Sequence, residues 1–340
     1  MIIVKQDLLN LEKENSVVIK NRNDFGPFSL DLRVNRLFED KKSKLDLNDQ
    51  DIPDQEYIDT YLEEIPLSDT GIVLSDSNNY FWQPMEEMSF ANDYSGRVFS
   101  RSSSARKGMC VTSDSSEYLK NLKTRNFCPL LSLSITGTEV NLRKGDSIAQ
   151  LVIYDLSYSI VTPSEITQLI KRGNFEIKIN NNKLKYSEVQ EHNYINLHLG
   201  GKIWLYQGGV LDSKNSITKC FKEIDITKGI YIPEGSFFIS SSAEHVEIPQ
   251  RYIGMVAQMQ THHSHYHTHR EIPFISHPNA PVIAPKNIFK GTITFENYMF
   301  VDGIIKEGMF LSQMYLEKLS NDALTVPSKY INQKGATLAK

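Results

Sequence analysis

The sequence has no long Lys/Arg block and no long apolar run. Its formal net charge is −4 over 340 residues. Non-specific binding to nucleic acid depends on neutralising phosphates, so we expect no nucleic-acid partner. No uninterrupted apolar segment is long enough to cross a bilayer, and Lys5 and Asp7 interrupt the first apolar stretch, so we expect neither a signal peptide nor a membrane partner.

Cysteine pairs and several nucleotide-site signatures are also missing. Cys110, Cys128 and Cys220 are widely spaced and form no CxxC motif, which favours buried thiols in a reduced, cytoplasmic protein. The sequence contains no P-loop and no Rossmann glycine pattern. It also lacks the HxE…PCxxC signature of the zinc-dependent nucleobase deaminases.

Short β-rich runs dominate what is present. FSLDLRV, GIVLS, KIWLY, GTITFE and others are separated by Gly, Asn, Asp and Pro turns, a pattern typical of an all-β sandwich or barrel. The strongest helix signal is 162–177, with Thr162 or Ser164 as the cap and Gly173 as the stop. The strongly charged segment 39–64 is interpreted as a solvated insertion that could hold a short helix.

The chain repeats itself in order, which predicts an internal duplication. Three pairs of segments match: YFWQPMEEMSFANDYSGRVFS (80–100) with FISSSAEHVEIPQRYIGMVAQ (238–258), SLDLRV (29–34) with INLHLG (195–200), and VNLRKGDSIAQLVIYDL (140–156) with GIIKEGMFLSQMYLEKL (303–319). Glu86 aligns with Glu244 in the first pair. We therefore predict a first unit at 1–160 and a second at 161–340.

The segment SRSSSARKGM (100–109) combines two arginines with four serines. An arginine fork surrounded by hydroxyls suits the oxygens of a phosphate, so the segment predicts an anion site. The alternative is that Arg101 and Arg106 pair with surface carboxylates, as most surface arginines do.

Several of these segments are similar to those of a known protein family. FSLDLRV, GRVFSRSSSARKGM and LRKGDSIAQLVIY resemble the family of trimeric dCTP deaminases and dUTP pyrophosphatases. The second half is more similar to the deaminase branch, through SEITQLIKRGNFEI, YINLHLGGKIW, GTITFE and the tail KYINQKGATLAK. The resemblance implies two tandem, distorted β-barrels of the dUTPase-like (β-clip) type, with a short helix opening the second.

In that family the site is split between neighbouring units, and here the two half-sites have segregated. The first repeat keeps the Arg/Ser element, but its pocket strand CPLLSLSI (128–135) has no glutamate. The second repeat keeps Glu296, whereas its counterpart of the Arg/Ser element reads QMQTHHSHYHTHR (258–270). The resemblance therefore predicts one composite site, supplied by both repeats.

The resemblance also assigns roles. Glu296 would be the general base, with Ser102 and Arg106 orienting the water and stabilising charge. The substrate-binding set would be Arg101, Ser103, Thr294, Phe295, Lys329 and Gln333. Mg²⁺ would arrive on the nucleotide triphosphate, and no protein-bound catalytic metal is expected. The predicted reaction is hydrolytic deamination of dCTP to dUTP. A dUTP or other nucleotide pyrophosphohydrolase and a non-catalytic nucleotide-binding regulator are the alternatives.

Three features are left open. Ala284 stands where the family usually has the Asp of a VIDP-like turn, so the base and sugar specificity are not fixed. His263, His265, His267 and His269 alternate and would share one face of a strand, which fits a zinc or nickel site, a nucleotide contact or a pH-sensitive surface. A homo-oligomer is compatible with the family, but its order is not predicted.

Overall fold

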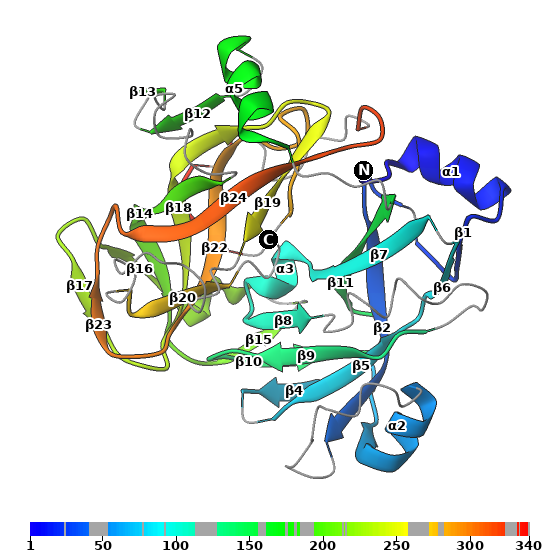
Figure 1. Cartoon of the computed structure of the whole chain (residues 1–340). Coiled ribbons are helices and arrows are strands. Elements are labelled where there is room, and N and C mark those ends of the chain that lie inside the picture. Colours follow the sequence, from blue (N-terminus) through cyan, green and yellow to red (C-terminus); the bar gives the residue numbers. More distant parts are fainter. Residues whose placement is uncertain are drawn as a thin grey trace.

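The molecule consists of two β-rich units, which lie side by side in Figure 1. The described residues of the computed structural model are 1–23, 25–40, 54–76, 78–91, 93–112, 128–155, 161–173, 176–179, 182–183, 194–212, 214, 216–257, 272–277, 282–323, 332 and 334–338. Strands dominate both units and helices are few, so the all-β architecture with few helices is confirmed.

The first repeat is built on a curled sheet with the strand order β7-β11-β2-β5-β9-β8. The strands β7 and β8 at the two ends of this order lie next to each other, so the sheet forms a nearly closed barrel. Its elements are α1 (Lys5–Lys13), β1 (Val17–Lys20), β2 (Leu30–Asp40), α2 (Asp54–Tyr61), β3 (Leu62–Ile65), β4 (Ile72–Ser75), β5 (Tyr80–Pro84), β6 (Glu87–Phe90), β7 (Tyr94–Ser100), α3 (Ser102–Ala105), β8 (Met109–Thr112), β9 (Leu131–Ile135), β10 (Glu139–Leu142) and β11 (Ser147–Asp155).

The second repeat has a larger curled sheet with the order β13-β12-β18-β14-β24-β19-β21, in which β22 also pairs with β18 and β20. Its elements are α5 (Pro163–Lys171), β12 (Glu176–Ile179), β13 (Asn182–Lys183), β14 (Ile195–Tyr206), β15 (Val210–Asp212), the 3₁₀ helix η2 (Ile217–Cys220), β16 (Phe221–Asp225), β17 (Ile230–Ile232), β18 (Phe237–Glu247), β19 (Tyr252–Ala257), β20 (Phe274–His277), β21 (Val282–Ile283), β22 (Gly291–Met299), β23 (Gly303–Ile305) and β24 (Phe310–Lys318).

Helix α5 opens the second repeat as predicted. Thr162 is the cap, and it forms a capping box with Glu165, whose backbone N–H donates to the Thr162 hydroxyl. The helix ends at Lys171, and Gly173 follows with a φ of 70°. None of the described helices is long and apolar enough to span a membrane.

The strand pairings show which residues of the two repeats correspond. Asp31 lies opposite Gln150 on β11, and Asn196 lies opposite Gln313 on β24. Leu30 therefore corresponds to Ile195, so the sequence match of 29–34 with 195–200 is wrong by one residue. The ladder of β4 with β10 corresponds in the same way to the ladder of β17 with β23.

The duplicated glutamates are buried acceptors beside these strands. Glu86 accepts hydrogen bonds from the backbone N–H and the Nε of Arg33, at 3.0 and 2.7 Å. Glu244 accepts from the backbone N–H of His198 at 3.0 Å and lies 2.7 Å from its Nδ1. Both carboxyl groups are fully buried. The repeated glutamate thus has a structural role in each barrel.

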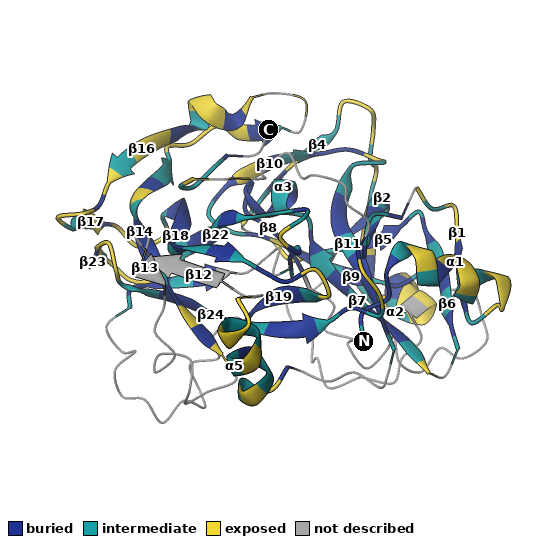
Figure 2. Cartoon of the chain, turned by 90° about the horizontal axis from the view of Figure 1, so that it is seen from above, coloured by how far each residue is buried: buried dark blue, intermediate teal, exposed yellow. Residues whose placement is uncertain are grey.

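Two hydrophobic clusters cross the boundary between the repeats. The core of the first barrel continues through Phe237, Ile239 and Leu211 of the second repeat and also takes in Leu338. A second cluster joins Ile2 and Tyr154 to residues of β19 and to Leu319. Buried residues accordingly run through both barrels in the view of Figure 2. The repeats therefore share their apolar interior, and this places their facing side chains in fixed positions.

The charged insertion is not simply a solvated arm. Its described part contains α2 and β3, and Ile58 and Leu62 are only 4% and 3% exposed. Together with Phe38 they form a small cluster, against which Tyr57 and Phe81 pack. The helix that the segment could hold is present, but its apolar side covers one edge of the first barrel.

Candidate active site

The Arg/Ser element folds into a tight turn between β7 and β8, in the middle of the molecule (Figure 1). α3 spans Ser102–Ala105, and Gly108 follows it with a φ of 83°. A Cβ at Gly108 would lie 2.4 Å from the Thr138 hydroxyl, so only glycine fits this turn. The turn carries Arg106 away from the first barrel and toward the second.

Arg106 and Glu296 meet at the boundary between the repeats. The Nε of Arg106 lies 4.0 Å from Oε1 of Glu296, and the two side chains are 5% and 4% exposed. Arg106 follows α3 in the first repeat, whereas Glu296 belongs to β22 in the second. The structure thus brings together the two residues that the sequence analysis placed in opposite half-sites.

Burial dominates the electrostatics of Glu296. Loss of water raises the pKa of its carboxyl to about 8, although the charge of Arg106 acts in the opposite direction. At neutral pH the carboxyl is therefore mostly protonated. A carboxyl that titrates close to neutrality beside a fixed cation can both accept and donate a proton.

Strand pairing sets what surrounds Glu296. Trp204 on β14 lies opposite Ile239 on β18, which in turn lies opposite Glu296 on β22. Since directly paired residues share one face of a sheet, these three side chains form a row across it. Ile239 belongs to the apolar core of the first barrel. The row therefore faces the first repeat.

A close backbone approach holds the first repeat against this row. Gly137 has a φ of 62°, and a Cβ there would lie 3.1 Å from Cβ of Phe237 and 3.1 Å from a ring carbon of Tyr298. Phe237 and Tyr298 are a directly paired couple on β18 and β22, two residues along from Ile239 and Glu296. Glycine at this turn lets the two barrels come close enough for Arg106 to reach Glu296.

The described part of the C-terminal tail lies beside the same row. The indole Nε1 of Trp204 donates to the carbonyl of Ala336 at 3.2 Å, and the hydroxyl of Thr292 donates to the carbonyl of Gly335 at 3.3 Å. Leu338 is 9% exposed and packs in the core of the first barrel. The tail therefore contacts both repeats next to the Arg106–Glu296 pair.

Arg101 precedes α3 at the start of the Arg/Ser element and pairs with Asp31 on β2 of the first repeat. Its Nη2 is 3.2 Å from Oδ2 of Asp31, and its side chain is 34% exposed. Burial raises the pKa of Asp31, and Arg101 partly offsets this shift. Ser102 and Ser103 are also partly exposed, whereas Ser104 is buried. Arg101 does pair with a carboxylate, but part of its guanidinium and two neighbouring hydroxyls remain accessible to an anion.

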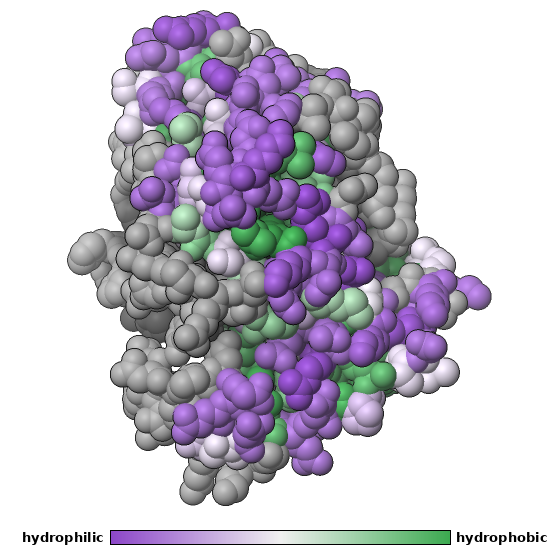
Figure 3. Space-filling model, turned by 90° about the vertical axis from the view of Figure 1, so that its right-hand side faces the viewer, coloured by the Kyte–Doolittle hydropathy of each residue, from purple (hydrophilic) through white to green (hydrophobic). Residues whose placement is uncertain are grey.

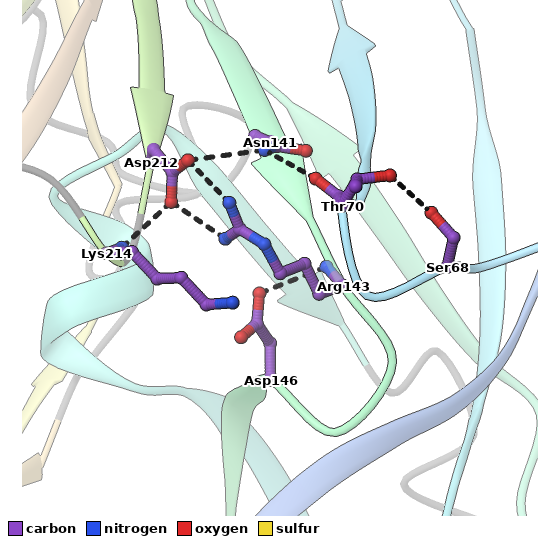
Figure 4. A network of polar contacts seen from close by, with 7 residues as sticks. All are labelled: Ser68, Thr70, Asn141, Arg143, Asp146, Asp212 and Lys214. Carbon is purple, nitrogen blue, oxygen red and sulfur yellow. Dashed lines mark hydrogen bonds and ion pairs between the residues drawn. The ribbon is translucent and has the colours of Figure 1, made fainter.

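A polar network next to Lys107 was not predicted from the sequence. Arg143 makes a two-point ion pair with Asp212, with Nη1–Oδ1 and Nη2–Oδ2 distances of 2.7 and 2.6 Å, and Asn141 donates to the same carboxylate at 3.2 Å (Figure 4). Lys107 is only 7% exposed; burial lowers its pKa, and Asp146 and Asp212 oppose that shift. Arg143 belongs to the first repeat and Asp212 to the second, so the network also joins the barrels.

Among the described residues of the first repeat, the row that corresponds to the acidic site carries no carboxylate. The row equivalent to Trp204, Ile239 and Glu296 consists of Phe38, Phe81 and Ser132. The apolar side of α2 packs against Phe38 and Phe81. The position of Glu296 is therefore taken by a serine in the first repeat, and the insertion covers the neighbouring part of that row.

The other predicted site residues are placed as follows. Thr294 is half-buried and lies two residues from Glu296 on the same face of β22. Phe295 points the other way and packs in the core of the second barrel, so only its backbone could contact a nucleotide. Ala284 packs against the cluster that contains Ile2 and Tyr154. Outside the described residues lie Lys329, Gln333, His263, His265, His267 and His269.

Comparison with known proteins agrees with this architecture. The family model described as dCTP deaminase-like matches residues 2–156 and again residues 160–319. The fold is also similar to the crystal structure of 2'-deoxycytidine 5'-triphosphate deaminase from Agrobacterium tumefaciens, with a TM-score of 0.74 and 17% sequence identity, over 94% of this chain and 98% of that one. No curated protein sequence matches the chain.

These findings define a two-barrel protein with the dCTP deaminase fold. The chain belongs to the dCTP deaminase-like family and contains the family's domain twice.

Proposed function

We propose that the protein deaminates dCTP to dUTP by hydrolysis, at one site between its two repeats. The observation that carries the proposal is the buried pair of Arg106 and Glu296, in which each repeat supplies one residue. The family and the similar fold of a dCTP deaminase support the choice of a cytosine nucleotide.

The proton chemistry follows from the surroundings of Glu296. In the proposed reaction water adds to C4 of cytosine, the C4–amino bond breaks, and ammonia leaves. The carboxylate of Glu296 takes one proton from the attacking water and then delivers it to the departing nitrogen, while the second water proton moves to N3 as C4 becomes a carbonyl. A pKa of about 8 makes the second step favourable near neutral pH, and Arg106 favours the ionised form needed for the first. Arg106 and Ser102 would orient the water and stabilise the charge that develops on it.

The triphosphate would lie along the Arg/Ser element. Arg101, Ser103 and the tail residues Lys329 and Gln333 are the proposed contacts, since guanidinium, ammonium and hydroxyl groups suit phosphate oxygens. Magnesium enters as part of the substrate, bound to the triphosphate. The docking of the tail on Trp204 and Thr292 supports a tail that covers the bound nucleotide.

The experiment measures ammonia and nucleotide products from dCTP and magnesium. We expect equal amounts of ammonia and dUTP from the wild type, and at least ~100-fold slower turnover in Glu296→Gln and Arg106→Ala. Glu317→Gln is the matched control, because Glu317 is just as buried on β24 but is not part of the proposed site. This control is expected to keep the wild-type rate.

Two outcomes would contradict the proposal, and each favours one alternative. Pyrophosphate without ammonia would indicate a nucleotide pyrophosphohydrolase. Binding of dCTP without turnover would indicate a regulator that has kept the barrels but lost the reaction.

A further inference from the structure

A polar side chain interrupts the apolar core of the second barrel, directly behind the proposed site. At the end of the molecule formed by the first repeat, the described surface is mostly hydrophilic and its hydrophobic residues form small, separate areas (Figure 3). Inside the second barrel the side chains are apolar instead, and Phe295 and Met299 on β22 belong to this core. Asn297 lies between them on the same face of the strand and is only 1% exposed. It directly follows Glu296.

The amide of Asn297 ties β22 to β18 around the glutamate. Its Nδ2 donates to the Oγ of Ser240 at 2.9 Å and to the carbonyl of Phe238 at 3.3 Å. These two residues flank Ile239, which lies directly opposite Glu296. The same Nδ2 donates at 3.2 Å to the carbonyl of the residue that precedes the glutamate. One side chain therefore holds the pair of Ile239 and Glu296 from behind.

The hydrogen bonds of this amide leave one of its polar atoms unpaired. Within the described residues, the Oδ1 of Asn297 is buried and has no hydrogen-bond partner. Burying an amide oxygen without a partner costs free energy, so a leucine, whose side chain branches in the same way, would suit this core better. The stability of the barrel therefore does not account for the asparagine.

The first repeat shows that the fold does not need polar residues at these positions. Strand pairing places Leu133 of the first repeat at the position of Asn297. It likewise places Trp82 at the position of Ser240. Both Leu133 and Trp82 belong to the apolar core of the first barrel. The hydrogen-bonded pair of asparagine and serine thus occurs only in the repeat that also carries the glutamate.

We propose that Asn297 is a positioning residue, which fixes the strand pair around Glu296 so that the carboxyl group of Glu296 stays beside the guanidinium of Arg106. Asn297 itself cannot touch the substrate, since its side chain lies in the core, on the face of β22 opposite to Glu296. It acts through Glu296, because a small displacement of a group that transfers protons slows a reaction strongly. The effect on turnover rests on the proposed function, whereas the effect on the position of Glu296 does not.

The first test is the turnover of dCTP. Asn297→Leu should lower kcat at least ~10-fold and leave KM unchanged, because it displaces Glu296 but removes no contact with the substrate. Ser240→Ala removes only one acceptor of the amide and should lower kcat by a smaller factor, and the double variant should be no slower than Asn297→Leu. Ser276→Ala is the matched control, because Ser276 lies directly opposite Asn297 at 8% exposure and its Oγ has no hydrogen-bond partner among the described residues. Wild-type kcat in Asn297→Leu or in Ser240→Ala, or an equal loss in Ser276→Ala, would overturn the proposal.

The second test needs no substrate. The charge of Arg106 lowers the pKa of Glu296, so Glu296 should titrate at higher pH in Asn297→Leu, where it is no longer held beside Arg106. Urea unfolding at several pH values measures this titration, as the difference between Asn297→Leu and Asn297→Leu/Glu296→Gln, beside the difference between the wild type and Glu296→Gln. A protein that shows this shift but does not deaminate dCTP would contradict the proposed function and support the positioning role. An unshifted titration would overturn the positioning role.

Discussion

Arg143 of the first repeat and Asp212 of the second form a two-point ion pair at the edge where β10 and β15 run in parallel. The two side chains are 9% and 12% exposed. Because hydrogen bonds from Arg143 lower the pKa of Asp212, this carboxylate stabilises the folded chain above the ordinary aspartate pKa of about 4. The contribution is lost as the pH falls below that value.

The first prediction concerns this pair. Asp212→Asn should lower the free energy of unfolding at pH 7 by about 1–2 kcal/mol, less than for a fully desolvated pair because some water still reaches the carboxylate. It should also flatten the loss of stability between pH 5 and pH 2. Urea unfolding at several pH values measures both effects. Asp225→Asn is the control, because Asp225 is exposed and its side chain accepts hydrogen bonds from Thr227 in its own turn. An equal loss in this variant would rule out a special role for the pair.

The second prediction uses the buried Glu296. Its folded-state pKa is about 8 and its unfolded pKa is near 4, so ionising it in the folded state costs free energy. The wild type should lose stability relative to Glu296→Gln as the pH rises from about 4 to 8, by roughly 5 kcal/mol at about 1.4 kcal/mol per pKa unit, with no further change above pH 8. Denaturant unfolding of both proteins without nucleotide gives this difference. A constant difference across the range would mean that Glu296 titrates normally.

The third prediction concerns the contact of Gly137 with the second repeat. Gly137→Ala and Gly235→Ala both place a side chain at a positive φ, which costs about 1–2 kcal/mol in each case. Only at Gly137 does the new methyl meet other atoms of the opposite repeat, since nothing lies within 4 Å of a Cβ at Gly235. Gly137→Ala should therefore be the less stable variant and should separate Arg106 from Glu296. Unfolding midpoints and dCTP turnover of the two variants, measured together, make the comparison.

The fourth prediction concerns the tail. Trp204→Phe keeps most of the ring but removes the hydrogen bond to Ala336, at a cost of about 1 kcal/mol. Amides of residues 334–338 should then exchange with deuterium faster, as measured by mass spectrometry. Tyr206→Phe removes a hydrogen bond to Gly209 from the same strand and should leave exchange in the tail unchanged. Unaltered exchange in Trp204→Phe would show that the indole does not hold the tail.

The fifth prediction concerns the covered row in the first repeat. Because Ser132 replaces the glutamate and α2 packs on Phe38 and Phe81, one nucleotide should bind per chain. Titration calorimetry with dCTP measures this number, and a value of two would contradict it.

The packing of α2 on this row can be tested by stability. Ile58→Ala should destabilise the chain by about 2–4 kcal/mol through loss of buried packing. Glu56→Ala, on the exposed side of the same helix, should have little effect.

Much of the fold could be predicted because turn residues and strand-like runs are local signals. The duplication and the opening helix α5 were predicted for the same reason, and the pairing of Arg106 with Glu296 followed from the half-site that each repeat lacks. The sequence match of 29–34 with 195–200 was wrong by one residue, because the register depends on which residues pair across the strands and not on similarity of the residues alone.

Other parts depend on packing that local sequence does not reveal. Trp204, Lys107 and the Arg143–Asp212 pair acquire their roles only when distant segments meet. The segment 39–64 was interpreted as solvated because of its overall charge. Ile58 and Leu62 are four residues apart, a spacing that places both on one face of a helix and could have indicated a buried face.

The placement of Ile2 has a consequence for how the chain is made. Its backbone pairs with Tyr154 in the first repeat and with Leu319 in the second, and its carbonyl accepts from the N–H of Ser320. Ile2 is made before Leu319 and Ser320, so its hydrogen bonds cannot be complete until the end of β24 has been made. The first barrel therefore cannot reach its final state before residues 318–320 have been made, and a chain stopped before residue 318 should expose the apolar side of β11 to chaperones and proteases.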